Sequence, residues 1–166
     1  MDDIQGLDEV KSNLRRLGNT RKAKNAATRS ARKSMNIVKK AAVNNAKAID
    51  DPESPERIWK NIITKPKRMR SDGFVLMRVG VRGGSKKYVS TKRNVRAGRA
   101  GKSYSTGGDK SNPGGDTFHF RFLELGTANM PAQPILRIAL WNNTENVKSK
   151  FIESFGLEIT KELNKM

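Results

Sequence analysis

The sequence predicts an α+β fold with N-terminal helices, a small and mostly antiparallel sheet that carries a long basic loop, and a C-terminal helix packed on the sheet. Apolar residues recur every three or four positions in the first fifty residues and again after Pro134, which predicts helices. Apolar residues alternate with others along two further segments, which predicts strands. A chain of 166 residues can bury one modest core, so we expect a single domain, 1–166. Its four regions are 1–50, 51–81, 82–116 and 117–166.

The first region is expected to form two helices. Over residues 3–17 the apolar side chains fall on one stripe. A longer helix is expected from Thr20 to Ile49, where the good helix formers Ala, Lys and Arg predominate. Its apolar face buries little area, so this helix needs a partner, either the sheet or another subunit. We assign to that face Ala23, Ala27, Ala31, Met35, Val38, Ala42 and Ile49.

The second region is expected to hold a helical turn and a strand. Ser54 followed by Pro55 is a helix-start signal, which predicts a turn of helix through residues 58–63. A basic segment follows this turn, and it is either a connector or the start of a strand. Alternation over residues 74–81 then predicts a strand that pairs with a second strand at 117–125.

The third region, residues 82–116, is a basic loop that contains eight of the 14 glycines and few apolar residues. A loop of this length inside a compact domain is unusual, so it is either functional or disordered. A short strand is possible around residues 87–90.

The fourth region reads as strand, stiff corner and helix. The strand ends at Gly126, because glycine adopts backbone angles that other residues avoid. Pro131 and Pro134 hold the next residues extended. The last segment, 134–164, has the richest apolar content and predicts a helix with interruptions at Asn142–Thr144 and at Gly156.

Residues 122–137 read Phe-Leu-Glu-Leu-Gly-Thr-x-x-Met-Pro-Ala-x-Pro-x-Leu-Arg. This order and spacing resembles the signature of the neck proteins of long-tailed bacteriophages, the head–tail joining or tail-completion family. The basic helical start, which contains Gly-Leu-Asp-Glu-Val at 6–10, is similar to that family in layout.

The resemblance implies a structural virion protein that joins head to tail or completes the tail. It implies a ring of six or twelve copies around the DNA channel, next to the connector, stopper and tail-terminator proteins. It also implies a location in the host cytoplasm during assembly and in the virion afterwards. The stiff corner would fix the helix and help to set the subunit contact through Glu124, Leu125, Gly126, Thr127, Met130, Pro131, Ala132, Pro134 and Arg137.

Glu124 is the one acidic residue of the signature. It could act as a catalytic carboxylate, but no second carboxylate or base lies near it in the sequence. A structural role is favoured, in which it accepts backbone N–H groups at the corner or pairs with Arg121 or Arg137.

The formal net charge is +18, and it is uneven. Residues 60–110 hold 15 Lys and Arg against two Asp, whereas residues 111–166 hold six charges of each sign. The cations of the basic loop could be solvated, could contact the phosphates of genomic double-stranded DNA, or could dock on an acidic neighbouring protein. They are Arg82, Lys86, Lys87, Lys92, Arg93, Arg96, Arg99 and Lys102.

The sequence gives little support for a phosphate-binding loop or a metal site. Gly101-Lys102-Ser103 resembles the end of a phosphate-binding loop, but Arg96 stands where that loop needs glycine. His119 is the only histidine and no cysteine exists, so no metal site is expected. We therefore expect no enzyme activity, no cofactor and no membrane association. The alternative to a neck protein is a free-standing, sequence-independent nucleic-acid-binding protein, which the charge alone would suggest.

Overall fold

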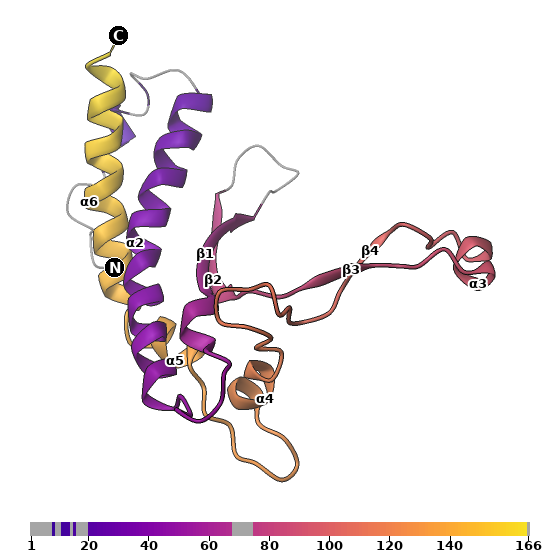
Figure 1. The fold of residues 1–166 in the computed structure, drawn as a ribbon. Coiled ribbons are helices and arrows are strands. Elements are labelled where there is room, and N and C mark those ends of the chain that lie inside the picture. The colour runs from indigo at the N-terminus through magenta and orange to yellow at the C-terminus, as the bar shows by residue number, and fades with distance from the viewer. Residues whose placement is uncertain (1–7, 9–10, 14, 16–19, 68–74, 166) are drawn as a thin grey trace. The chain divides into compact units, whose positions relative to one another are not determined.

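The computed structural model describes residues 8, 11–13, 15, 20–67 and 75–165. The described residues of the first predicted helix are helical, and its apolar stripe lies outside the described residues. The prediction of a mixed helix and sheet fold with a C-terminal helix is confirmed. The elements are α2 (Thr20–Ala48), the 3₁₀ helix η1 (Ile58–Asn61), β1 (Ile62–Lys67), β2 (Leu76–Val81), β3 (Ser85–Lys87), α3 (Lys92–Arg96), β4 (Ser103–Ser105), α4 (Phe120–Leu125), α5 (Leu136–Trp141) and α6 (Thr144–Leu163) (Figure 1).

Two compact units are present, and each is made of separate stretches of the chain. The helical unit comprises the described parts of 1–41, 64–79 and 138–166, and the arm unit comprises 42–63 and 80–137. Each unit is described by itself below.

In the helical unit, α2 lies beside α6 (Figure 1). Ala26 and Ile159 are fully buried, and Ala23, Phe155 and Leu163 pack against them. The sequence predicted the sheet or another subunit as the partner of α2, whereas this cluster packs α2 against the C-terminal helix α6. The small side chains of α2 allow close approach of the neighbouring helix.

The buried stripe of α2 differs from the predicted one. Ser30 and Ser34 are buried, whereas Ala27 and Ala31 are only partly buried. The hydroxyl of Ser34 donates to the carbonyl of Ser30 at 3.1 Å, so a serine is buried here with its donor satisfied. The sequence pattern assigned the alanines to the core because it weighs apolarity and not this local hydrogen bond.

Ion pairs also join α2 to α6. The carboxylate of Glu158 accepts from Arg29 at 2.6 Å and from Lys33 at 2.7 Å, and Arg29 also reaches Glu162 at 2.7 Å. Hydrogen bonds from Lys33 and Arg29 lower the pKa of Glu158 from 4.5 to about 2. The nearly buried carboxylate of Glu158 is therefore held in its charged form.

In the arm unit, the buried Asn61 holds together two distant segments. Its amide nitrogen donates to the Gly115 carbonyl at 3.0 Å and to the Thr117 hydroxyl at 2.8 Å, and its side-chain oxygen accepts from Gly114 N–H at 2.8 Å. The predicted helical turn is present as η1, but Ser54 does not cap it, since the N-cap residue is Arg57. The buried apolar residues of this unit are Ala42, Ala46, Ile58, Ile62 and Ile135.

The predicted strand at 117–125 is wrong. Residues 120–125 form the helix α4, in which Phe122 N–H donates to the His119 carbonyl at 2.9 Å. Phe118 and Phe122, which a strand would place on one face, also meet one helical turn apart, with ring centroids 6.3 Å apart. The spacing of Phe118 and Phe122 is thus compatible with both periods, whereas Phe120, two residues from each, shares their face only in a strand. β2 is confirmed as a strand, but it pairs with β1.

The basic loop is ordered into a hairpin. β3 and β4 pair antiparallel, and α3 lies between them in the chain. The C-terminal helix is divided at residues 142–143 into α5 and α6, as the Asn-Asn-Thr interruption predicts, whereas Gly156 lies within α6.

Candidate functional site

The corner segment, residues 124–137, is organised by the carboxylate of Glu124. That carboxylate accepts three successive backbone N–H groups, from Ile135 at 2.7 Å, Leu136 at 2.9 Å and Arg137 at 3.0 Å. These are the free N–H groups at the start of α5, so Glu124 stands where a helix needs an acceptor. The structural interpretation of Glu124 as an acceptor of backbone N–H groups is what the geometry shows.

The side chain of Arg137 also contacts Glu124. Its Nε lies 3.4 Å from Oε1 of Glu124, and its guanidinium donates to the main-chain carbonyl of Glu124. Arg121, the other predicted partner of Glu124, instead donates to the Phe118 carbonyl at 3.1 Å. Of the two arginines that sequence reasoning offered, the structure selects Arg137.

The electrostatics of Glu124 oppose a role as a general acid or base. Burial by itself would raise its pKa, but the N–H groups of Leu136, Arg137 and Ile135 and the charge of Arg137 together hold that pKa below its ordinary value. A carboxylate that is ionised and fully engaged by donors neither gives nor takes a proton near neutral pH.

Backbone contacts stiffen the rest of the corner segment. Thr127 and Met130 form an isolated antiparallel bridge, and Gln133 N–H donates to the Leu123 carbonyl at 2.7 Å. Gly126 has a φ of 77°, and a Cβ there would lie 2.9 Å from the nitrogen of Ala132. Only glycine fits both conditions without displacement.

The corner segment presents an exposed side as well as a fastened one. The side chain of Leu125 is 70% exposed, although it lies next to the nearly buried Glu124. Thr127, Pro131 and Ala132 are also exposed, and Met130 and Pro134 are partly buried. The exposed side of the corner segment therefore includes the apolar side chains of Leu125, Pro131 and Ala132.

The basic arm, residues 82–105, holds the eight predicted cations. In its ribbon Lys86 lies opposite Tyr104, while Ser85 and Lys87 lie opposite Ser105 and Ser103. Because successive residues of a strand point to opposite faces, Lys86 and Lys87 lie on different faces of the ribbon.

The tip of the basic arm is ordered by hydrogen bonds and not by an apolar core. The hydroxyl of Thr91 caps α3 by accepting from Asn94 N–H at 3.2 Å. The carbonyl of Asn94 accepts from the backbone N–H of Arg99 at 2.8 Å and from that of Ala100 at 3.2 Å. These bonds turn the chain back toward β4. These hydrogen bonds therefore fix the backbone positions from which the cations of the tip extend.

All eight cations of the basic arm are exposed. None of them forms an ion pair with any residue in the described part of the chain. On the Lys86 face, Tyr88 and Tyr104 contact each other with ring centroids 4.5 Å apart. Ser103 begins a strand, so the Gly-Lys-Ser sequence does not precede a helix as a phosphate-binding loop requires.

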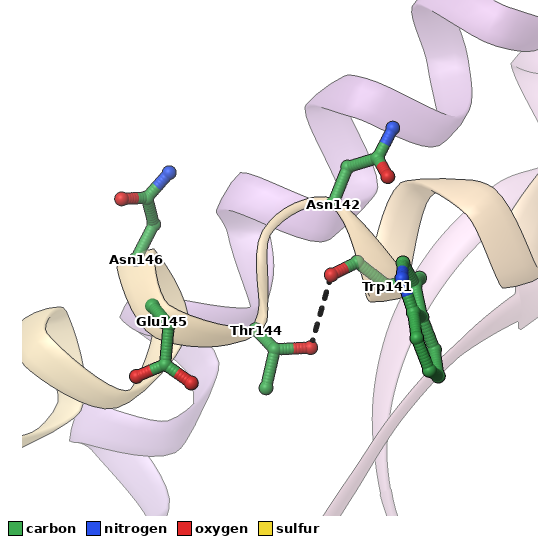
Figure 2. Close-up of a pocket in the computed structure, with 5 residues that line it drawn as sticks. All are labelled: Trp141, Asn142, Thr144, Glu145 and Asn146. Atoms are coloured by element: carbon green, nitrogen blue, oxygen red, sulfur yellow. Dashed lines mark hydrogen bonds between the residues drawn. The ribbon is translucent and has the colours of Figure 1, made fainter.

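Sequence reasoning missed the exposure of several apolar residues that it assigned to the C-terminal helix, and Trp141 is the most exposed of them. The side chain of Trp141 is 83% exposed at the junction between α5 and α6. There the hydroxyl of Thr144 donates to the Trp141 carbonyl at 3.2 Å, and a shallow hollow lies beside Glu145 and Asn146 (Figure 2). No periodic signal distinguishes this tryptophan from a core residue, since Ile138 and Leu140 of the same helix are also exposed.

Comparisons with known proteins add no assignment, because no family model, no curated protein and no solved structure matches the chain. Within the described residues, no group of three His, Cys, Asp or Glu side chains could hold a metal ion. None of the described helices is long and apolar enough to cross a membrane.

Proposed function

We propose that this protein is a structural component of a bacteriophage neck, which joins head to tail or completes the tail as one ring around the DNA channel. The observation that carries the proposal is the corner segment, where the 122–137 signature coincides with a locally fastened loop. A closed ring needs one repeated angle between neighbouring copies, and a stiff surface supplies it.

The residues of the signature divide into two groups that fit this role. Glu124, Gly126 and Arg137 hold the corner segment together through the contacts described above. Leu125 and Pro131 are exposed, and their side chains take no part in those hydrogen bonds, although the ring of Pro131 restricts its own backbone. Their exposure supports a subunit contact, in which apolar side chains at the centre of an interface supply most of the binding free energy.

The exposed apolar side chains of α5 support the same role. Trp141 is 83% exposed, and Leu140 and Ile138 are each nearly half exposed. Tryptophan is among the residues most enriched at interface centres. We assign this helix to a contact with another copy or with an adjoining neck ring, and the cations of the basic arm to the lumen or to that ring.

An assembly assay tests the corner segment. Leu125→Glu should weaken self-association by about thirtyfold, which corresponds to roughly 2 kcal/mol of binding free energy. Light scattering and mass photometry measure the mass of the assembled ring. They are applied to the purified chain and to the chain mixed with an extract that contains the other neck proteins. Leu157→Glu, at an exposed leucine of α6 that is 57% accessible, is the matched control and should assemble normally. Equal assembly of both variants would remove the corner segment from the contact.

Electron microscopy of tailed particles tests the location. A label fused to this chain should appear between head and tail in finished particles. Finished, infectious particles that contain none of this chain, from a virus that carries its gene, would refute the neck assignment. The free-standing nucleic-acid-binding protein is the alternative that such a result would favour, because the eight exposed cations of the basic arm would remain to be explained.

A further inference from the structure

We infer that the basic arm binds duplex DNA by entering a groove, so that phosphates lie against both faces of its ribbon. The inference rests on the proposed function, which supplies the duplex and leaves open whether the basic arm meets DNA or an acidic protein. It names the partner and the way in which the arm is used.

Positive charge lies on both faces of the ribbon. The register places Lys86 on the face that holds Tyr104, and Lys87 on the face that holds Ser103 and Ser105. Cations on both faces are useful only where negative charge lies on both sides. A groove of a duplex has a phosphate wall on each side, whereas an acidic protein surface meets one face of a ribbon.

The ribbon also matches the major groove in size. Two paired strands are about 4.8 Å apart, and a ribbon with its side chains fits the major groove, which is about 12 Å wide. The minor groove, about 6 Å wide, is narrower than the ribbon and would have to be widened by deforming the DNA. At the tip, Lys92, Arg93, Arg96 and Arg99 then lie within reach of further phosphates, because Thr91 and Asn94 hold that turn together.

The tyrosines of the basic arm disfavour a single strand as its ligand. Single-stranded nucleic acids bind to free aromatic faces on which bases stack. Tyr88 and Tyr104 contact each other at 4.5 Å, so part of each ring is already occupied. Lysine and arginine that contact phosphates read no bases, so the binding is independent of sequence.

The experiment uses the full-length chain and a fluorescent 20-base-pair duplex, with binding followed by anisotropy from low to high salt. Arg93→Gln, Arg96→Gln, Arg99→Gln and Lys102→Gln combined should weaken binding by about tenfold or more and flatten the salt dependence, by about 0.9 in the logarithmic slope for each phosphate that is no longer neutralised. The control removes the same number of charges from α6 and the residues after it, through Lys148→Gln, Lys150→Gln, Lys161→Gln and Lys165→Gln, and should bind nearly as the parent does. Equal weakening in the two variants would overturn the inference, because binding would then follow net charge.

Two further comparisons test the groove. Lys86→Gln and Lys87→Gln, on opposite faces, should each lower the salt slope by about 0.9. A change with only one of them would mean that the basic arm lies flat on its ligand, which overturns the groove. Polyglutamate of equal charge and a single strand of equal length should both compete less well than the duplex, and equal competition by either overturns the choice of partner. None of these readouts depends on virions, so the neck assignment and this inference can fail separately.

Discussion

Glu124 and Arg137 hold each other through both main chain and side chain. The Glu124 carboxylate accepts the N–H of Arg137 at 3.0 Å and lies 3.4 Å from its Nε, while the Arg137 guanidinium donates to the Glu124 carbonyl. The end of α4 and the start of α5 are thereby tied across the corner segment.

Two substitutions of Glu124 should weaken these contacts and lower the free energy of unfolding to different extents. Glu124→Ala leaves three N–H groups without an acceptor and should lower the free energy of unfolding by about 3 kcal/mol. Glu124→Gln keeps one acceptor oxygen but directs an amide donor toward N–H groups, and should cost about 2 kcal/mol. Urea unfolding measures both, and a Gln variant as stable as the parent would show that the carboxylate charge contributes nothing. Glu145→Gln, at an exposed pair with Lys148, is the control.

Asn61 should tolerate no isosteric exchange. Asn61→Asp replaces the nitrogen that donates to the Gly115 carbonyl and the Thr117 hydroxyl with an oxygen that accepts. We expect a decrease in stability of about 2 kcal/mol and a fall in Tm of roughly 4–8 °C. Thermal unfolding followed by circular dichroism measures it. An unchanged Tm would mean that the loop at 114–117 is held by other contacts.

Acid should weaken the helical unit through Glu158. Its folded-state pKa of about 2 lies below the ordinary 4.5, so its contribution to stability is complete above pH 4.5 and is lost as the pH falls toward 2. The stability difference between the parent and Glu158→Gln, about 1 kcal/mol at pH 6, should therefore shrink over that window. Urea titrations at several pH values measure it. Glu153→Gln, whose exposed partner is Lys150, should differ little from the parent throughout, and a similar shrinkage there would remove the assignment to Glu158.

The two tryptophans should behave in opposite ways. Trp59 is partly buried, donates to Asp50 at 3.3 Å and lies under Lys47 and Lys60, so Trp59→Ser should cost about 2 kcal/mol. Trp141 is 83% exposed, so Trp141→Ser should change the free energy of unfolding by no more than about 0.5 kcal/mol. Thermal unfolding compares the variants, while light scattering asks whether Trp141→Ser reduces assembly. A large decrease in stability with Trp141→Ser would place its indole in the core.

The tip of the basic arm should depend on one hydroxyl. Thr91→Val keeps the shape but removes the acceptor of Asn94 N–H, at a cost of about 1 kcal/mol to the local structure. Hydrogen exchange at residues 94–96 should become faster, whereas Thr91→Ser should leave it unchanged. Unchanged exchange with valine would show that the cap does not order the tip.

The sequence alone determined the features that depend on local patterns. The long helix, the strand at 76–81, the break at residues 142–143, the turn at Gly126 and the corner role of Glu124 follow from periodicity, from the angles that glycine permits and from a lone carboxylate before a helix start. Tertiary structure decided the features for which the local pattern is ambiguous. Phe118 and Phe122 would share one face of either a strand or a helix, and the helix α4 is formed where Glu124 reaches the N–H groups of α5. The hydroxyl of Ser34 is satisfied by a local bond to the Ser30 carbonyl, but its burial depends on tertiary packing. The choice of Arg137 over Arg121 and the exposure of Trp141 depend on packing in the same way, which no spacing between adjacent residues can encode.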